Sequence, residues 1–250
     1  MKEKLYTIPL NDAFGAGDEC PFCYAERSLE QNAIDFVLGS GASYMESDIR
    51  EATDNAGFCR HHLKMMYDYG NSLGNGLILK THFKKLTKGL LEQFDGLKPA
   101  KKSLFSGKSS QSVNPVSAYI AEKEKRCYVC EYYRGTYERY VDTFFYLFNK
   151  DPEFTDRLKD SKGFCVHHLG ELMEKAEKAL NPDKQKELFG ILKKLCEDNY
   201  SRITEDITWF CDKFDYRNKD ADWKNSKDAI PRTMQKIAGG YPADDPYKAN

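Results

Sequence analysis

A six-residue pattern, Gly-Phe-Cys-x-His-His, occurs twice in the chain and constrains its fold more than any other feature. The two copies are residues 57–62 and 163–168, and each follows a Cys-x-x-Cys pair, residues 20–23 and 127–130. Thirty-five residues separate the first pair from the next cysteine of its half, and thirty-four do so in the second half. Matched spacing of this kind is typical of the duplication of one supersecondary unit.

The composition decides how the eight cysteines are interpreted. The chain has 250 residues, of which 40% are hydrophobic and 31% charged, as in an ordinary globular protein. Its apolar runs are too short to cross a bilayer, and residues 1–9 lack the features of a signal peptide. We therefore expect a cytoplasmic protein, in whose reducing compartment paired cysteines indicate metal or redox chemistry rather than disulfides.

Apolar residues recur at helical spacing along most of the chain, and no strand pattern is apparent. Residues 1–18 are expected to be irregular, because Pro9, Gly15 and Gly17 interrupt any periodicity. The fold class predicted is all-α, built from two tandem pseudo-repeats. The expected helices cover about residues 21–38, 46–55, 59–67, 77–94, 182–214 and a short stretch within 223–240.

The repeat also predicts the organisation of the chain. We expect an N-terminal helical repeat at 1–96, a flexible linker rich in Lys, Ser and Gly at 97–114, a C-terminal repeat at 115–240, and a polar tail at 241–250. The net charge of −1 gives no general reason to expect nucleic acid or a membrane surface as a partner.

Three cysteines and a histidine in each half provide the tetrahedral ligand set that Zn²⁺ prefers. If each third cysteine begins a helix, the histidine three residues later shares its face, whereas the one at two residues does not. This selects His62 and His168, and leaves His61 and His167 as surface residues or hydrogen-bonding neighbours of the ligands. The predicted metal ligands are Cys20, Cys23, Cys59 and His62 in the first half and Cys127, Cys130, Cys165 and His168 in the second.

Each predicted metal fixes the N-termini of two helices, whose dipoles stabilise the thiolates. Local ligand sets are the simpler arrangement, because each duplicated unit then folds alone. A crossed arrangement, in which Cys20 and Cys23 meet Cys165 and His168, stays open. Four protein ligands close the site to water, which is typical of structural zinc, so we expect two structural Zn²⁺ per chain.

Other interpretations were weighed against zinc. Cys20-Pro-Phe-Cys23 is similar to a glutaredoxin-type redox motif, but that motif follows a strand. An iron–sulfur cluster with one histidine ligand is chemically feasible, although such clusters usually take four cysteines. Unliganded core residues explain the matched spacing poorly. Cys196 and Cys211 lack partners at motif spacing and are expected to be buried thiols, and the aromatic stripe of residues 133–148 is expected to be a packing face.

Motifs spread along the chain resemble an uncharacterised family of Firmicutes, mostly clostridial, proteins of unknown function. They are residues 4–9, the two Cys-x-x-Cys pairs, the two Gly-Phe-Cys-x-His-His copies, 139–147, 215–218 and Trp223. The resemblance implies a Cys-x-x-Cys paired with a Gly-Phe-Cys-x-x-His in each half, and it supplies no activity.

Three functional hypotheses follow. The first is a zinc-stabilised interaction or regulatory module, which implies a protein partner that the sequence does not identify. The second is a thiol-based redox or iron–sulfur sensor. The third is an enzyme, although no Ser/His/Asp arrangement or phosphate-binding glycine loop is apparent.

Overall fold

We describe the fold from a computed structural model, which covers residues 4–97 and 114–240. Every regular element in these ranges is helical, which confirms the all-α prediction. Nearly all of the expected linker, at 98–113, and the tail at 241–250 lie outside the described residues. The α-helices are α1 Lys4–Gly15, α2 Pro21–Leu38, α3 Ser47–Ala56, α4 Arg60–Tyr69, α5 Ser72–Asp95, α6 Pro115–Glu124, α7 Tyr128–Lys150, α8 Pro152–Asp160, α9 Val166–Ala179, α10 Pro182–Asp212 and α11 Ala229–Ala238, and the 3₁₀ turns are η1 Ser43–Met45 and η2 Tyr216–Asn218.

The expectation that residues 1–18 are irregular is wrong, because α1 continues through Pro9. Leu10 and Ala13 on this helix are fully buried, and the Phe14 ring packs edge-on against Phe154 with centroids 5.1 Å apart. Proline removes a single backbone hydrogen bond, so the burial of Leu10 and Ala13 and the ring contact of Phe14 outweigh its helix-breaking tendency.

The longest predicted helix is confirmed as α10, which begins at Pro182 as expected. Asn181 caps it by accepting a hydrogen bond from the backbone N–H of Lys184, and the absent N–H of Pro182 leaves nothing unsatisfied at this position. Helix α5 begins five residues earlier than predicted. There the side chain of Asn71 accepts from the N–H of Gly74, so a capping residue overrides the weak helix propensity of the glycines.

The described residues form two compact units, 4–29 with 135–240 and 30–97 with 114–134. We call them unit 1 and unit 2. The expected division at 1–96 and 115–240 stays a prediction, and so does the origin of the chain by tandem duplication. The first part of α2 and the last part of α7 belong to unit 1, and the remainder of each helix belongs to unit 2.

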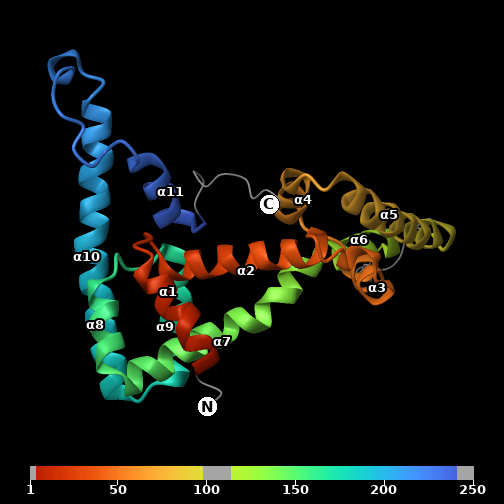
Figure 1. Ribbon diagram of the computed structural model, residues 1–250, viewed down its shortest axis with the longest axis horizontal. Helices are drawn as coiled ribbons and strands as arrows, with labels where there is room; N and C mark the ends of the chain where they lie inside the picture. Colours follow the sequence, from red (N-terminus) through yellow and green to blue (C-terminus); the bar gives the residue numbers. More distant parts are fainter. Residues whose placement is uncertain (1–3, 98–113, 241–250) are drawn as a thin grey trace, which may run out of the picture. The chain divides into compact units, whose positions relative to one another are not determined.

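The core of unit 1 is aromatic and centres on Phe144 of α7. Its ring lies 5.8 Å from Phe22 and 5.6 Å from Phe154, and all three side chains are at most 1% exposed. Tyr137 and Phe148 of the same helix are buried as well, so the predicted packing face is confirmed for its unit 1 members. Helices α9 and α11 lie against the long α10 (Figure 1).

The core of unit 2 is aliphatic, with α3 and α6 lying against α5 (Figure 1). It combines the end of α2 with residues from α4, α5 and the start of α7. Its fully buried members include Ala33, Ile34, Val37, Leu38, Met66, Ile78 and Val129. None of the described helices is long and apolar enough to cross a membrane.

Candidate metal centres

Eight of the ten cysteines and histidines of the repeated motifs gather into two groups, each able to hold a metal ion. Within each group all four ligand atoms lie within 4.8 Å of one another. Cluster 1, in unit 1, consists of Cys20, Cys23, Cys165 and His168, and cluster 2, in unit 2, of Cys59, His62, Cys127 and Cys130.

Both clusters are built from pairs of helix N-termini. At each of these N-termini, one ligand directly precedes the helix and a second ligand is the third residue of that helix. Cys20 and Cys23 flank the start of α2 and pair with Cys165 and His168 at the start of α9. The start of α4 and the start of α7 supply cluster 2 in the same way. The dipoles of two helices therefore favour negative charge at each cluster.

A glycine with left-handed backbone begins each Gly-Phe-Cys segment. Gly57 has a φ of 67° and Gly163 a φ of 72°, values that other residues rarely adopt. The carbonyl of Gly57 also accepts a hydrogen bond of 2.8 Å from the N–H of Tyr128, the first residue of α7. This contact holds the segment that carries Cys59 against the helix that carries Cys127 and Cys130.

The distances within the clusters match a coordination tetrahedron. Bond lengths of about 2.3 Å for Zn–S and about 2.05 Å for Zn–N place two sulfurs about 3.8 Å apart and a sulfur and a nitrogen about 3.6 Å apart. In cluster 1 the Cys23 and Cys165 sulfurs lie 3.7 Å apart, and three sulfurs lie 3.2–3.5 Å from Nδ1 of His168. In cluster 2 the corresponding sulfur-to-Nδ1 distances are 3.2–3.4 Å.

The local ligand sets favoured by the sequence are wrong. Cys20 and Cys23 meet Cys165 and His168, and the Cys59 segment meets the second Cys-x-x-Cys pair, so the arrangement left open is the observed one. From Cys23, helix α2 carries the chain about 23 Å to its end at Leu38 before the chain turns toward Cys59. Closeness in sequence therefore does not become closeness in space.

A carboxylate lies beside the second ring nitrogen of each cluster histidine. Nε2 of His168 lies 3.1 Å from Glu26, and Nε2 of His62 lies 3.2 Å from Glu30. In both rings Nδ1 faces the sulfurs. A metal-bound histidine usually donates its other ring N–H to such a carboxylate, which fixes the tautomer and strengthens the ligand. The two glutamates are four positions apart on α2.

The side chains of cluster 1 alone cannot carry three thiolates. Hydrogen bonds from Cys20 and Cys23 lower the pKa of the Cys165 thiol far below its usual value, while the hydrogen bond with Cys165 raises the pKa of Cys23. Burial disfavours the charged His168 ring, but its contacts with Cys165 and Cys20 raise its pKa to about 12. A divalent cation would supply the positive charge that lets all three sulfurs ionise.

Cluster 2 has the same electrostatic character in a less buried setting. Burial raises the pKa of the Cys127 thiol, but the hydrogen bond with His62, the backbone hydrogen bonds from Cys130 and Cys59 and the charge of His62 together lower it to about 6. Burial and then the neighbouring Cys127 raise the pKa of Cys130. Cys59 and Cys130 are both partly exposed. This cluster could therefore meet solutes that cannot reach cluster 1.

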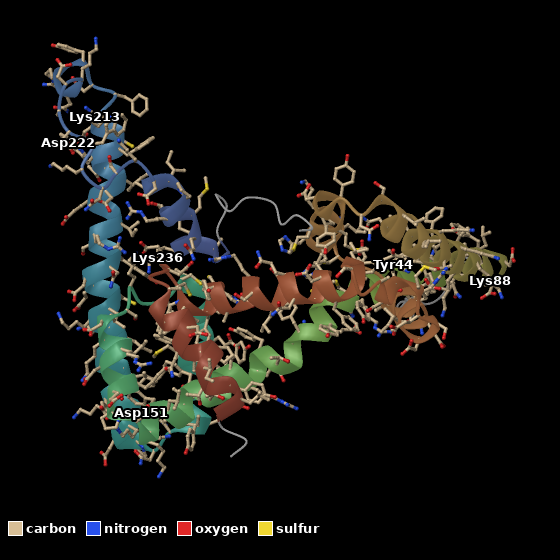
Figure 2. The ribbon with its side chains drawn as sticks, in the orientation of Figure 1. Tyr44, Lys88, Asp151, Lys213, Asp222 and Lys236 are labelled. Carbon is tan, nitrogen blue, oxygen red and sulfur yellow. The ribbon has the colours of Figure 1, made fainter. Side chains whose placement is uncertain are left out.

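Cluster 1 is covered by the end of α11. All three of its cysteines are fully buried, and a Cβ added at Gly239 would lie 3.5 Å from the Cys165 sulfur and 3.6 Å from the Cys23 sulfur. Lys236 on α11 (Figure 2) donates to the carbonyls of Glu19 and Lys162, at 2.5 and 2.6 Å. These bonds fasten α11 to the residue before Cys20 and to the loop before Cys165.

The remaining cysteines and histidines of the motifs and of α10 lie outside the two clusters. His167 is exposed, and His61 is exposed with Nε2 3.5 Å from Glu30. Cys196 is partly buried. Cys211 is exposed, so the expectation of a buried thiol is wrong there, because the end of α10 leaves this face to solvent.

Sequence reasoning did not find Glu26, Glu30 or the α11 residues that cover cluster 1. Glu26 follows Cys23 by three residues on α2 and thus shares its helical face, which was an available signal. Lys236 gave no signal, since it lies far from the motifs in sequence.

The fold and the two clusters define an all-helical protein with paired Cys₃His centres of the kind that bind metal ions. Its sequence matches the model of a family of unknown function, DUF6062, over residues 1–244, and the chain belongs to this family. No curated protein matches the sequence. No solved structure matches it either.

Proposed function

We propose that the protein binds two Zn²⁺ ions, one at each cluster, as structural centres of a helical interaction or regulatory module. The observation that carries the proposal is the tetrahedral spacing of three sulfurs and one imidazole nitrogen, present twice. Both sets are complete with protein ligands, which is typical of structural zinc. Each histidine also has a carboxylate at its second nitrogen.

The spacing favours a single ion per cluster over an iron–sulfur centre. An iron–sulfur cluster distributes its protein ligands over two or more irons, so ligands of different irons lie farther apart than one coordination sphere allows, whereas all four ligand atoms of each site here lie within 4.8 Å of one another. Here the Cys23 and Cys165 sulfurs are only 3.7 Å apart. A mononuclear ion needs this separation.

Helix α11 supports the interaction role, because it is oriented with its polar face inward. Gln235 and Lys236 are at most 4% exposed, whereas Met234 is 50% and Ile237 is 65% exposed. Ile230, one turn before Met234, is also exposed. An apolar stripe that a helix presents to solvent is typical of a contact surface.

Metal analysis of protein purified without added zinc tests the proposal. We expect about two zinc ions per chain and no absorbance near 400 nm. Removal of the metal should abolish cooperative unfolding, because structural sites contribute about 10–16 kcal/mol of apparent binding free energy in zinc-finger peptides. A folded protein free of metal would refute the proposal, and absorbance near 400 nm would indicate iron–sulfur.

A second candidate function is thiol-based sensing at cluster 2. Cys59 and Cys130 are partly exposed, and their sulfurs lie within 4.8 Å. Hydrogen peroxide would oxidise these two zinc-bound thiolates to one disulfide. The sulfurs lose two electrons, the peroxide takes these and two protons to form two waters, and Zn²⁺ leaves.

A zinc-binding dye reports this reaction directly. Under limiting peroxide we expect release of one zinc per chain, at least about tenfold faster than release of the second. Cys59→Ser should remove the fast phase and leave the slow one. Equal rates for both ions, or no release, would contradict sensing at cluster 2.

A further inference from the structure

We propose that a second site, in unit 1 and distinct from both clusters, binds a small oxyanion with two negative charges, of the phosphate class. A cavity of about 450 Å³ lies between α10, the start of α11 and the loops before Cys20 and Cys165. Ligand pockets begin at about 300 Å³, so a phosphate group fits. No aliphatic or aromatic side chain lines it, so only a polar ligand suits it.

The cavity carries more positive than negative side chains. Its basic residues are Lys162, Arg202, Lys224, Lys227 and Arg232. Its acidic residues are Glu19, Asp206 and Asp228. The walls therefore have an excess of two positive charges, which a dianion neutralises.

The three carboxylates are already engaged by the two arginines. Glu19 lies 2.6 Å from Arg202, and Arg232 lies 2.8 Å from both Asp206 and Asp228. Glu19 is 3% exposed and Arg232 is 7% exposed, so these two side chains form a buried floor, while Asp228 at the rim is exposed. Nε of Arg232 and Oε1 of Glu19 have no hydrogen-bond partner within the described residues, so these two atoms of the floor remain available for hydrogen bonding.

Two of the three lysines, Lys224 and Lys227, stand free of carboxylates, whereas Lys162 lies 3.8 Å from Glu19. Over residues 4–97 and 114–240, neither Lys224 nor Lys227 forms an ion pair. The Lys224 ammonium instead lies 4.3 Å from the centre of the Trp209 ring. Two uncompensated ammonium groups beside paired arginines are the donors that a phosphate group recognises.

The loop that carries Lys224 is held in place. Lys213, labelled with Asp222 in Figure 2, is 8% exposed and donates to the carbonyls of Asn218, Lys219 and Ala221. The indole N–H of Trp209 donates to the carbonyl of Asp222 at 2.9 Å. Lys224 itself has a left-handed φ of 51°, which is uncommon outside glycine. The lysine is thus positioned before a ligand arrives, which lowers the entropic cost of binding.

Titration calorimetry on the full-length, zinc-loaded protein tests the site, with inorganic phosphate and glycerol 3-phosphate as probes at constant ionic strength. We expect saturable one-to-one binding to the wild type. The double variant Lys224→Gln/Lys227→Gln should bind at least about tenfold more weakly and keep its zinc content. Lys193→Gln is the matched control, because Lys193 is an exposed lysine of α10 paired with Glu197.

The two probes separate the sources of the anion. Tighter binding of glycerol 3-phosphate supports a phosphorylated metabolite, and equal binding supports free phosphate. No saturable binding below about 10 mM of either probe would overturn the proposal, and so would equal weakening in Lys193→Gln. In those cases the charged residues only fasten α11 to α10.

Discussion

Two double variants distinguish the crossed pairing of the ligands from the local pairing. Cys23→Ser/Cys165→Ser removes two ligands of cluster 1 and leaves cluster 2 untouched. Cys23→Ser/Cys59→Ser removes one ligand from each cluster. Both variants lose two thiols, so each is the matched control of the other.

The magnitude follows from the share of one ligand. Structural zinc sites contribute about 10–16 kcal/mol through four ligands, so one ligand contributes about 3 kcal/mol, or about a hundredfold in affinity. The chelator is chosen so that its zinc affinity lies between that of a wild-type site and that of a site a hundredfold weaker. It then removes zinc from any site that lacks a ligand and leaves intact sites loaded. We expect one zinc per chain in Cys23→Ser/Cys165→Ser and none in Cys23→Ser/Cys59→Ser.

Metal content after chelator treatment and desalting, measured by mass spectrometry, is the assay. Local pairing predicts the opposite result, with one zinc in Cys23→Ser/Cys59→Ser and none in the other variant. That outcome would refute the crossed arrangement. Far-ultraviolet circular dichroism before chelator treatment confirms that both proteins are helical when zinc is bound.

Three further predictions concern the surroundings of the clusters and the core. Burial opposes ionisation of Glu30, but its hydrogen bonds with His61 and His62 and the charges of these rings lower its pKa from 4.5 to about 2. The contribution of ionised Glu30 to the free energy of unfolding is therefore complete above about pH 4.5 and is lost as the pH falls toward 2. Glu30→Gln should weaken zinc binding at cluster 2 by about 10–100-fold at pH 7, and Glu26→Gln should do so at cluster 1, as chelator competition measures. Lys236→Met should lower the free energy of unfolding by about 3 kcal/mol and the melting temperature by about 10 °C, because it removes one cation from beside the buried Glu19. The exposed control variant Lys193→Met should change the melting temperature by about 1 °C. Phe144→Ala should cost about 3–5 kcal/mol in denaturant unfolding, since the ring is fully buried, and Phe83→Ala, at a position 68% exposed, should cost far less.

Much of the local structure was available from the sequence. The spacing of Cys59 and His62 identified His62, rather than His61, as the histidine on the same helical face as Cys59. The structure places His62 in cluster 2 and His61 at the surface. Pro182 identified the first residue of α10. Such predictions succeed because a helix fixes the relation between residues three or four apart wherever it lies.

The sequence could not give the partners of each helix end. Both pairings satisfy the same spacing and the same chemistry, and the choice between them depends on where α2 takes the chain. The irregular N-terminus predicted from Pro9 failed for a related reason, because the burial of Leu10 and Ala13 against other helices decides that α1 forms.

By itself, then, the sequence determined that the chain is helical and that eight residues act in two groups of three cysteines and one histidine. Only the tertiary structure decided that the ligand pairs cross between the two halves of the sequence and that Glu26 and Glu30 lie beside the cluster histidines. It also decided that the end of α11 covers cluster 1 and that cluster 2 is partly exposed. Spacing along a helix is a local property that the backbone enforces. Contacts between helices depend on burial summed over the whole core, to which residues far apart in the chain contribute.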